Sequence, residues 1–111
     1  MTSRYELFTG RNNQYYFRLV APNNEIILQS EGYVSVQGAE NGIASCRLNS
    51  PYDANYQRLI STANQPYFTL KAANWQVIGV SQMYSSNQAM EVGISAVKRY
   101  GPGAILVRQA S

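Results

Sequence analysis

The chain has 111 residues, of which 45% are hydrophobic and only 14% charged, and its formal net charge is +3. This composition is typical of a globular protein rather than a disordered one. The sequence contains no histidine, which excludes histidine-based acid–base catalysis, Ser-His and Cys-His nucleophile pairs and histidine-containing zinc sites. The N-terminal residues contain no signal-peptide core, and no apolar run approaches the length of a membrane span. We therefore expect a cytoplasmic protein with no membrane partner, and the single cysteine, Cys46, agrees with this.

The sequence is a tandem duplication. Residues 5–47 align without gaps with residues 56–98, at an offset of 51, and sixteen of the 43 pairs are identical. Two units of about fifty residues would each be marginal if they had to bury a core alone, so we expect the halves to share one core. We therefore predict a single domain over residues 1–111, made of repeat 1 at about 1–52 and repeat 2 at about 53–111.

Each repeat is expected to begin with strands. In repeat 1, residues 5–9 are predicted as the first strand and residues 15–21 as the second, with a polar turn between them. In the second strand, Phe17 and Leu19 alternate with polar or charged residues such as Arg18. The same alternation recurs in repeat 2, so we predict that the Phe and Leu face is the buried one.

A tight hairpin is predicted before the third strand of repeat 1. Asn24 suits such a turn because asparagine tolerates a positive φ. Its counterpart is Trp75, a poor residue for positive φ, so we expect a wider turn there or Trp75 outside the left-handed position. The third strands, over 26–28 and 77–80, carry apolar residues on both parities, which leaves their inward faces open.

One helix is predicted in each repeat. Ser35 and Ser86 have the character of N-caps, and the helices are expected to run roughly to Leu48 and Arg99. Apolar residues follow both serines at helical spacing, which predicts that one side of each helix faces the core.

Three positions within these helices are informative. Gly42 and Gly93 occupy matching places in mid-helix, where glycine costs about 1 kcal/mol relative to alanine. Their presence in both copies indicates a close approach of helix to sheet. Cys46 lies on the apolar side of its helix and its counterpart is Val97, so a core residue is favoured over a reactive thiol.

The segment around residues 55–60 is expected to close the first unit and open the second. At the same offset, residues 104–108 fall on residues 53–57, and the N-terminal and C-terminal strands would then be a split counterpart of this segment. The predicted fold is α+β, with two tandem β-β-β-α repeats, pseudo-twofold symmetry, antiparallel sheets, one helix per repeat and a shared central strand.

The chain closely resembles the duplicated YegP-like family of small bacterial proteins over nearly its whole length. The motifs that carry the resemblance are Tyr-Phe-x-Leu-x-Ala-x-Asn at 16–23 and 67–74, Ser-x-x-Tyr at 30–33 and 81–84, and Glu-x-Gly-Ile at 40–43 and 91–94. The resemblance implies a compact β-rich fold with one helix per repeat. It implies no activity, because the family is a domain of unknown function. The chain departs from the family pattern at Pro22, Trp75 and Cys46.

The links between third strand and helix are the first candidates for binding. In repeat 1 the link is Ser30-Glu31-Gly32-Tyr33, and the copy at 81–84 carries Gln82 and Tyr84. The two links could form paired polar and aromatic rims, with Glu31 and Gln82 as the residues that set specificity. The alternative is structural, with serine ending the strand and tyrosine packing over the start of the helix.

Two further candidates lie on the hairpins and strands. Trp75 at a hairpin tip is either an interaction anchor or a local packing residue. Arg18, Arg58, Lys71 and Tyr67 could line one face of a sheet and bind single-stranded nucleic acid. The candidate binding residues are therefore Trp75, Tyr33, Tyr84, Glu31, Gln82, Arg18 and Lys71, and no catalytic or metal-binding residue is expected.

The function predicted from the sequence is that of a non-enzymatic cytoplasmic interaction module. Its partner would be a protein or a small ligand, with no cofactor, and the protein is expected to be a monomer or a weak homodimer. The alternative is binding of RNA or single-stranded DNA through repeat 2. Residues 1–55 carry a net charge of −1 and residues 56–111 a net charge of +4, so an anionic partner should prefer the second half.

Overall fold

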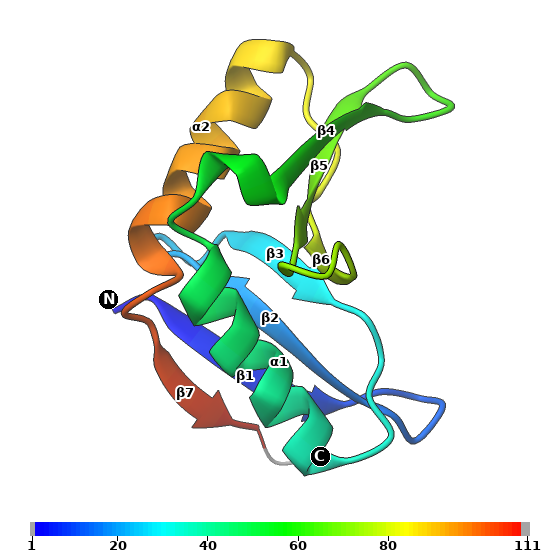
Figure 1. Ribbon diagram of the computed structural model, residues 1–111, viewed down its shortest axis with the longest axis vertical. Coiled ribbons are helices and arrows are strands. Elements are labelled where there is room, and N and C mark those ends of the chain that lie inside the picture. Colours follow the sequence, from blue (N-terminus) through cyan, green and yellow to red (C-terminus); the bar gives the residue numbers. More distant parts are fainter. Residues whose placement is uncertain (1, 110–111) are drawn as a thin grey trace.

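The computed structural model describes residues 2–109. Each repeat forms three strands followed by one helix, and a further strand ends the chain (Figure 1). Repeat 1 comprises β1 (Arg4–Thr9), β2 (Tyr15–Val20), β3 (Ile26–Ser30) and α1 (Val36–Asn49). A single 3-10 turn, η1 (Asp53–Asn55), leads into repeat 2, which comprises β4 (Tyr56–Ile60), β5 (Pro66–Lys71), β6 (Val77–Val80), α2 (Asn87–Tyr100) and β7 (Ile105–Arg108).

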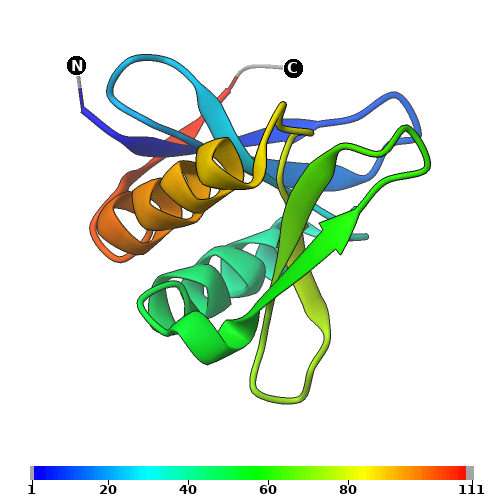
Figure 2. The ribbon, with the colours of Figure 1, turned by 90° about the horizontal axis from the view of Figure 1, so that it is seen from above.

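The strands of both repeats belong to one seven-stranded sheet, in the order β4-β5-β6-β3-β2-β1-β7. The two halves meet in the middle, where β3 and β6 pair antiparallel. The halves of the sheet lie at a steep angle to one another, and both helices sit inside this angle (Figure 2). The predicted α+β fold, with two repeats and one helix in each, is confirmed.

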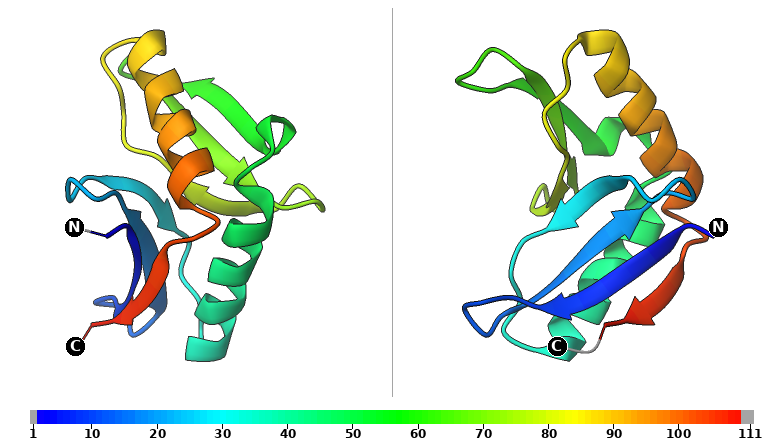
Figure 3. Two further views of the ribbon diagram at one scale, coloured as in Figure 1. Left: turned by 90° about the vertical axis from the view of Figure 1, so that its left-hand side faces the viewer. Right: turned by 180° about the vertical axis from the view of Figure 1, so that it is seen from behind.

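The predicted shared central strand is wrong. Within the described residues, β4 pairs only with β5 and lies at an edge of the sheet. The strand that follows α2 is β7, which crosses over to pair with β1 of repeat 1, and this pairing is parallel. β7 therefore lies beside β1 at one end of the sheet, with β4 at the other (Figure 3). The sheet is therefore mixed, since β7, which follows a helix, runs parallel to β1, whereas the other neighbouring strands pair antiparallel.

The buried face of the second strands is the predicted one, since Phe17 and Leu19 are fully buried, as are their counterparts Phe68 and Leu70. The third strands were ambiguous because each contains a β-bulge. The register shifts between Leu19 and Val20 in repeat 1 and at the equivalent place in repeat 2. One extra residue therefore enters β3, and the consecutive residues Ile27 and Leu28 are both buried.

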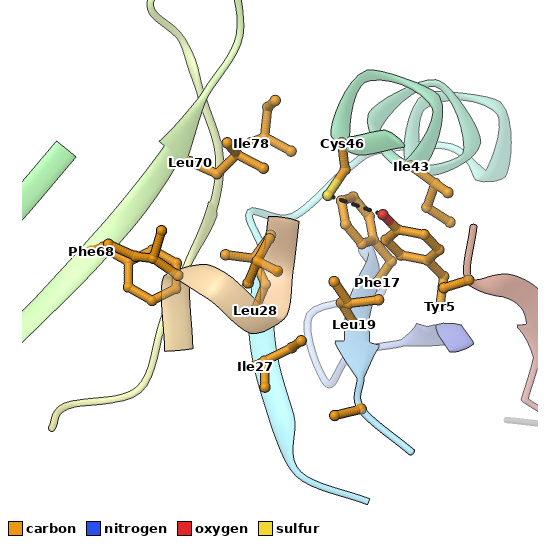
Figure 4. Close-up of a cluster of buried hydrophobic side chains, with 14 of the residues drawn as sticks. Tyr5, Phe17, Leu19, Ile27, Leu28, Ile43, Cys46, Phe68, Leu70 and Ile78 are labelled. Atoms are coloured by element: carbon orange, nitrogen blue, oxygen red, sulfur yellow. Dashed lines mark hydrogen bonds between the residues drawn. The ribbon is translucent and has the colours of Figure 1, made fainter. Parts of the chain in front are cut away.

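The core is one cluster of buried side chains drawn from both repeats. Its centre contains Tyr5, whose hydroxyl donates to the carbonyl of Gly101 at 2.6 Å and contacts Sγ of Cys46 at 3.2 Å (Figure 4). The equivalent hydroxyl of Tyr56 donates to the carbonyl of Ser50 at 2.6 Å. Cys46 is fully buried, as predicted, and this burial raises the pKa of its thiol to about 11.

Both helices begin at the predicted caps. The hydroxyl of Ser35 accepts from the backbone N–H of Gly38 at 2.9 Å, and Ser86 repeats this with Ala89 at 3.0 Å. The two mid-helix glycines make room for a tyrosine, because a Cβ at Gly42 or Gly93 would overlap the hydroxyl of the tyrosine before the same helix. At Gly42 such a Cβ would also meet the ring of Phe17 in β2 at 2.9 Å, in keeping with the predicted close approach to the sheet.

Candidate functional site

A groove of about 550 Å³ lies over the seam where the two repeats meet. We call it the seam groove. It combines apolar side chains from β3 and β6 with polar side chains from the links that follow these strands. The lining residues are Ile26, Leu28, Gln29, Ser30, Glu31, Val80, Ser81 and Gln82. The groove therefore contains two of the predicted site residues, Glu31 and Gln82, one from each repeat.

The serines of the seam groove have a structural role. The hydroxyl of Ser30 accepts from the N–H of Phe17 at 2.9 Å and donates to the carbonyl of Glu31 at 2.8 Å. Ser81 makes the same two bonds in repeat 2, with Phe68 at 3.0 Å and Gln82 at 2.8 Å. Each hydroxyl thus ends a strand and holds the chain that follows it. The geometry therefore supports the structural alternative, in which these serines end their strands.

The exposed polar side chains of the groove are those of Gln29, Glu31 and Gln82. Because Glu31 and Gln82 are repeat equivalents of different charge, the groove is symmetric in backbone and asymmetric in chemistry. One end carries a carboxylate and the other a neutral amide. Such a groove can bind an apolar group on its floor and hydrogen-bond donors at its rims.

Tyr33 and Tyr84 lie away from the seam groove. Tyr33 stacks on Phe17 with ring centroids 6.2 Å apart, and Tyr84 stacks on Phe68 at 6.3 Å. Each tyrosine lines a cleft between the hairpin of one repeat and the helix of the other. The cleft at Tyr84 measures about 340 Å³ and that at Tyr33 about 250 Å³. Burial raises the pKa of Tyr33, in keeping with a packing role.

Trp75 departs from the conformation expected for it. Its φ is 68°, in the left-handed region, and the equivalent Asn24 has a φ of 71°. The turns are the same, because the N–H of Trp75 bonds to the carbonyl of Ala72 at 2.8 Å as that of Asn24 bonds to Ala21 at 2.9 Å. The expected wider turn is wrong, since the hairpin hydrogen bonds hold the tryptophan in place. The indole is 52% exposed, and the ammonium of Lys71 lies 4.6 Å from the ring centroid.

The four residues proposed to line one sheet face do not do so. Arg58 stands opposite Phe68 in the sheet register, which places its side chain on the face that carries the helices. Its guanidinium bonds to Glu91 of α2 at 2.6 Å and to Asp53 at 2.9 Å. Arg18 lies on the opposite face and bonds to Glu6 at 2.7 Å.

The positive charge of repeat 2 is largely paired. Besides Arg58, Lys98 bonds to Asp53 at 2.7 Å and Arg108 bonds to Glu40 at 2.7 Å. The hydrogen bond from Arg58 and the nearby Lys98 lower the pKa of Asp53 to about 2, so this network stays ionised at neutral pH. Within residues 2–109, Lys71 and Arg99 are the cations of repeat 2 without a carboxylate partner.

The described residues contain no group of three or more metal-binding side chains that could hold an ion. Neither helix is long and apolar enough to cross a membrane. The carboxylates Glu6, Asp53, Glu40 and Glu91 are engaged in ion pairs, and the one thiol is buried.

Sequence reasoning missed the apolar floor of the seam groove and the residue Gln29. The local pattern gives no sign that β3 and β6 pair with each other, because they lie about fifty residues apart and belong to different repeats. A usable signal in the sequence was the polar Gln29 directly after the apolar run Ile26-Ile27-Leu28.

Comparison with known proteins agrees with this architecture. The model of the family described as "Domain of unknown function (DUF1508)" matches the chain twice, at residues 11–57 and 61–107. The first match ends in β4 and the second in β7. The chain therefore belongs to the DUF1508 family, here present as a tandem pair.

Uncharacterised bacterial proteins resemble the chain over most of its length. It is 50% identical to the UPF0339 protein YegP of Yersinia pestis over 92% of this chain and 91% of that protein. It is 51% identical to a UPF0339 protein of Acinetobacter baylyi over 94% of both chains. The solution structure of the yegP protein of unknown function from E. coli matches with a TM-score of 0.92 and 44% identity, covering 98% of this chain and 94% of that one. A UPF0339 protein from Shewanella oneidensis matches with a TM-score of 0.90 and 45% identity over 97% and 92%.

Proposed function

We propose that this protein is a non-enzymatic binding module of the cytoplasm and that the seam groove is its binding site. The observation that carries the proposal is the pairing of Glu31 with Gln82 across a groove with an apolar floor. The backbone there follows the twofold repeat, whereas the two rim side chains differ in charge. The two ends of the groove therefore offer a ligand different chemistry, a carboxylate at one and a neutral amide at the other.

The chemistry of the groove defines the class of ligand. Ile26, Leu28 and Val80 provide apolar lining, and the charged lining residue is a carboxylate, Glu31. A ligand with a small apolar group flanked by hydrogen-bond donors, neutral or cationic, would match both. An anionic ligand would meet the charge of Glu31 without a lysine or arginine in the lining to offset it.

The test is affinity capture from the native cell with wild-type protein and two charge variants. Glu31→Lys reverses the charge at one rim of the groove, and capture of the native ligand or partner should be lost. Gln88→Lys adds the same cation at an exposed position of α2, outside the groove, and should capture as the wild type does. Equal capture by all three proteins would rule out the groove as the binding site.

Nuclease treatment separates the nucleic-acid alternative in the same experiment. A nucleic-acid ligand would be lost on digestion, and its affinity would fall steeply between low and physiological salt. The ion pairs of repeat 2 leave few free cations for phosphate contacts. We therefore favour the groove, and expect capture to survive both treatments.

A further inference from the structure

We propose that the free edge of β4 is a second binding surface, which takes an extended segment of a partner protein as an added strand parallel to β4. This surface lies at the end of the sheet, away from the seam groove. The inference goes beyond the proposed function and does not depend on it. The partner segment is expected to be neutral and rich in apolar β-forming residues.

The model for the added strand is β7 in its place beside β1. β7 runs parallel to β1, with Ile105 opposite Arg4 and Arg108 opposite Leu7. The N–H of Gln109 donates to the carbonyl of Leu7 at 3.0 Å. β4 is the repeat equivalent of β1, but it also stands at the end of the first family match, where β7 stands in the second. β4 therefore holds two positions of the duplicated unit at once, that of β1 and that of β7. The place beside β4 that corresponds to β7 is left without a strand among residues 2–109.

The backbone groups that face this place can be identified from the hairpins. In repeat 2 the N–H of Ser61 donates to the carbonyl of Gln65 at 2.9 Å, as Gly10 donates to Gln14 at 2.8 Å in repeat 1. Because bonded and non-bonded pairs alternate along an antiparallel ladder, Gln57 and Leu59 bond to β5, whereas Arg58 and Ile60 direct their N–H and C=O groups outward. The same alternation directs the N–H and C=O groups of Leu7 in β1 outward. The carbonyl of Leu7 does accept a hydrogen bond from Gln109, the residue after β7.

The outward N–H groups of β4 differ in their state. The N–H of Tyr56 is already bonded to the carbonyl of Asp53 in η1. Those of Arg58 and Ile60 have no backbone partner within the described part of the chain. The open segment therefore begins at Arg58, next to the end of the 3-10 turn.

The edge lacks two of the features that usually prevent strand addition, proline and a bulge. β4 contains no proline and its register with β5 is continuous, without a bulge. Its one charged side chain, Arg58, is neutralised by Asp53 and Glu91. Ile60 is 57% exposed, so an apolar side chain from an added strand would gain a contact there. These properties favour a neutral apolar segment, similar to the Ile-Leu-Val of β7.

A second copy of the protein is a less suitable occupant. Two β4 edges joined about a twofold axis perpendicular to the sheet would run antiparallel, unlike β7 on β1. If β7 of one copy paired with β4 of another copy, β1 of the first copy would lose its partner. The exchange would therefore add no strand pairing overall. We therefore assign the surface to an extended segment of a different protein.

The test uses a synthetic peptide with the sequence of residues 103–109, blocked at both ends, as a probe of strand addition. It is titrated into the ¹⁵N-labelled full chain. We expect saturable shifts, and slowed hydrogen exchange, at the amides of Arg58 and Ile60. The amide of Leu7, the repeat equivalent of Arg58, should be protected from exchange before any peptide is added and should not change.

Two proline variants provide the matched control. Ile60→Pro removes an outward N–H that the sheet does not use, so the fold should remain and the peptide shifts should be lost. Thr62→Pro places proline at the second position of the neighbouring turn, where it is favoured, and should bind the peptide as the wild type does.

Three results would overturn the proposal. The first is the absence of any shift at Arg58 and Ile60 at millimolar peptide. The second is a shift at β1 and β7 in place of β4, which would show exchange of the terminal strand. The third is a concentration-dependent shift of Arg58 and Ile60 without peptide, accompanied by dimer in sedimentation, which would assign the edge to a second copy.

Discussion

At the scale of single residues, Trp75 occupies a backbone conformation that its own side chain disfavours. The chain has four non-glycine residues at positive φ, and the other three are asparagines, Asn13, Asn24 and Asn64, within residues 2–109. A non-glycine residue in this region costs about 1–3 kcal/mol, less for asparagine. The contact with Lys71 returns about 0.5–1 kcal/mol. Strain of this kind at an exposed hairpin tip is a reason to keep Trp75 among the candidate contact residues.

We predict that Trp75→Asn changes the free energy of unfolding by less than about 1 kcal/mol, because relief of strain offsets the lost contact with Lys71. Trp75→Ala removes the same indole but keeps an unfavourable backbone, so it should be less stable than Trp75→Asn by about 1 kcal/mol. Urea unfolding followed by far-UV circular dichroism measures both. Equal stabilities would show that the turn is not strained, and losses of several kcal/mol in both would place the indole in the core.

Among residues 2–109, Glu6 is the buried charged residue, with a side chain only 8% exposed. Burial alone would raise the pKa of Glu6, but hydrogen bonds from Arg18 and Arg4, each at 2.7 Å, lower it below the ordinary value of 4.5. A carboxyl whose pKa is lowered in the folded state adds stability above its unfolded pKa. That stability is lost as the pH falls below about 4.5 and through the folded-state pKa.

We predict that Glu6→Gln lowers the free energy of unfolding at pH 7 by about 1–3 kcal/mol, because two arginines lose a charged acceptor. The difference between wild type and variant should shrink as the pH falls below about 4.5, since the carboxyl of the unfolded chain takes up its proton there, and should go on shrinking through the lowered folded-state pKa. The variant Arg4→Asn, Glu6→Gln, Arg18→Thr installs the three repeat-2 counterparts together and should lose less than Glu6→Gln. A pH-independent difference would show that the ion pairs do not contribute.

At the scale of secondary structure elements, the two helices follow from local rules, and their glycines show where those rules give way to packing. Gly38 and Gly42 both lie in α1, but only at Gly42 would a Cβ overlap the ring and hydroxyl of Tyr33. At Gly38 the nearest atom to such a Cβ is Oγ of Ser35, at 3.2 Å, and the repeat equivalent is already Ala89.

We predict opposite effects for the two alanine substitutions. Gly38→Ala should stabilise the protein by about 0.5–1 kcal/mol through helix propensity. Gly42→Ala should destabilise it by about 1–3 kcal/mol, because overlap with Tyr33 outweighs the same gain. Thermal unfolding of the two variants decides between them. A stabilising Gly42→Ala would show that Tyr33 moves freely and does not fix the start of the helix.

Much of the element-level structure could be predicted from the sequence, since caps such as Ser35 and alternating strands such as β2 are encoded by neighbouring residues. The bulge that buries both Ile27 and Leu28 could not, because it depends on the register against another strand. The positions of β4 at an edge and of β7 beside β1 also depend on pairings between residues far apart in the sequence. Glu31 and Gln82 could be recognised as candidates from the links in which they lie. The groove that unites them could not, because it depends on the pairing of β3 with β6.

At the scale of the whole molecule, the two repeats depend on each other. The buried cluster includes Leu19 and Ile43 from repeat 1 together with Leu70 and Ile94 from repeat 2. Repeat 1 also receives β7 from the far end of the chain, through which the outer edge of β1 is paired. Neither half therefore has its complete core or its complete sheet without the other.

The last prediction follows from this dependence. Residues 1–52 expressed alone would lack β7 and the partner of β3, so we expect the fragment to be unfolded or to form a homodimer that replaces the missing half. Mixed with residues 53–111, it should recover a folded one-to-one complex, because the joint between them lies in the exposed segment after α1. Circular dichroism and sedimentation equilibrium measure both results, and the full chain is the control. A stable folded monomer of residues 1–52 would contradict the shared core, since the apolar face of β2 and α1 would then need no second repeat to cover it.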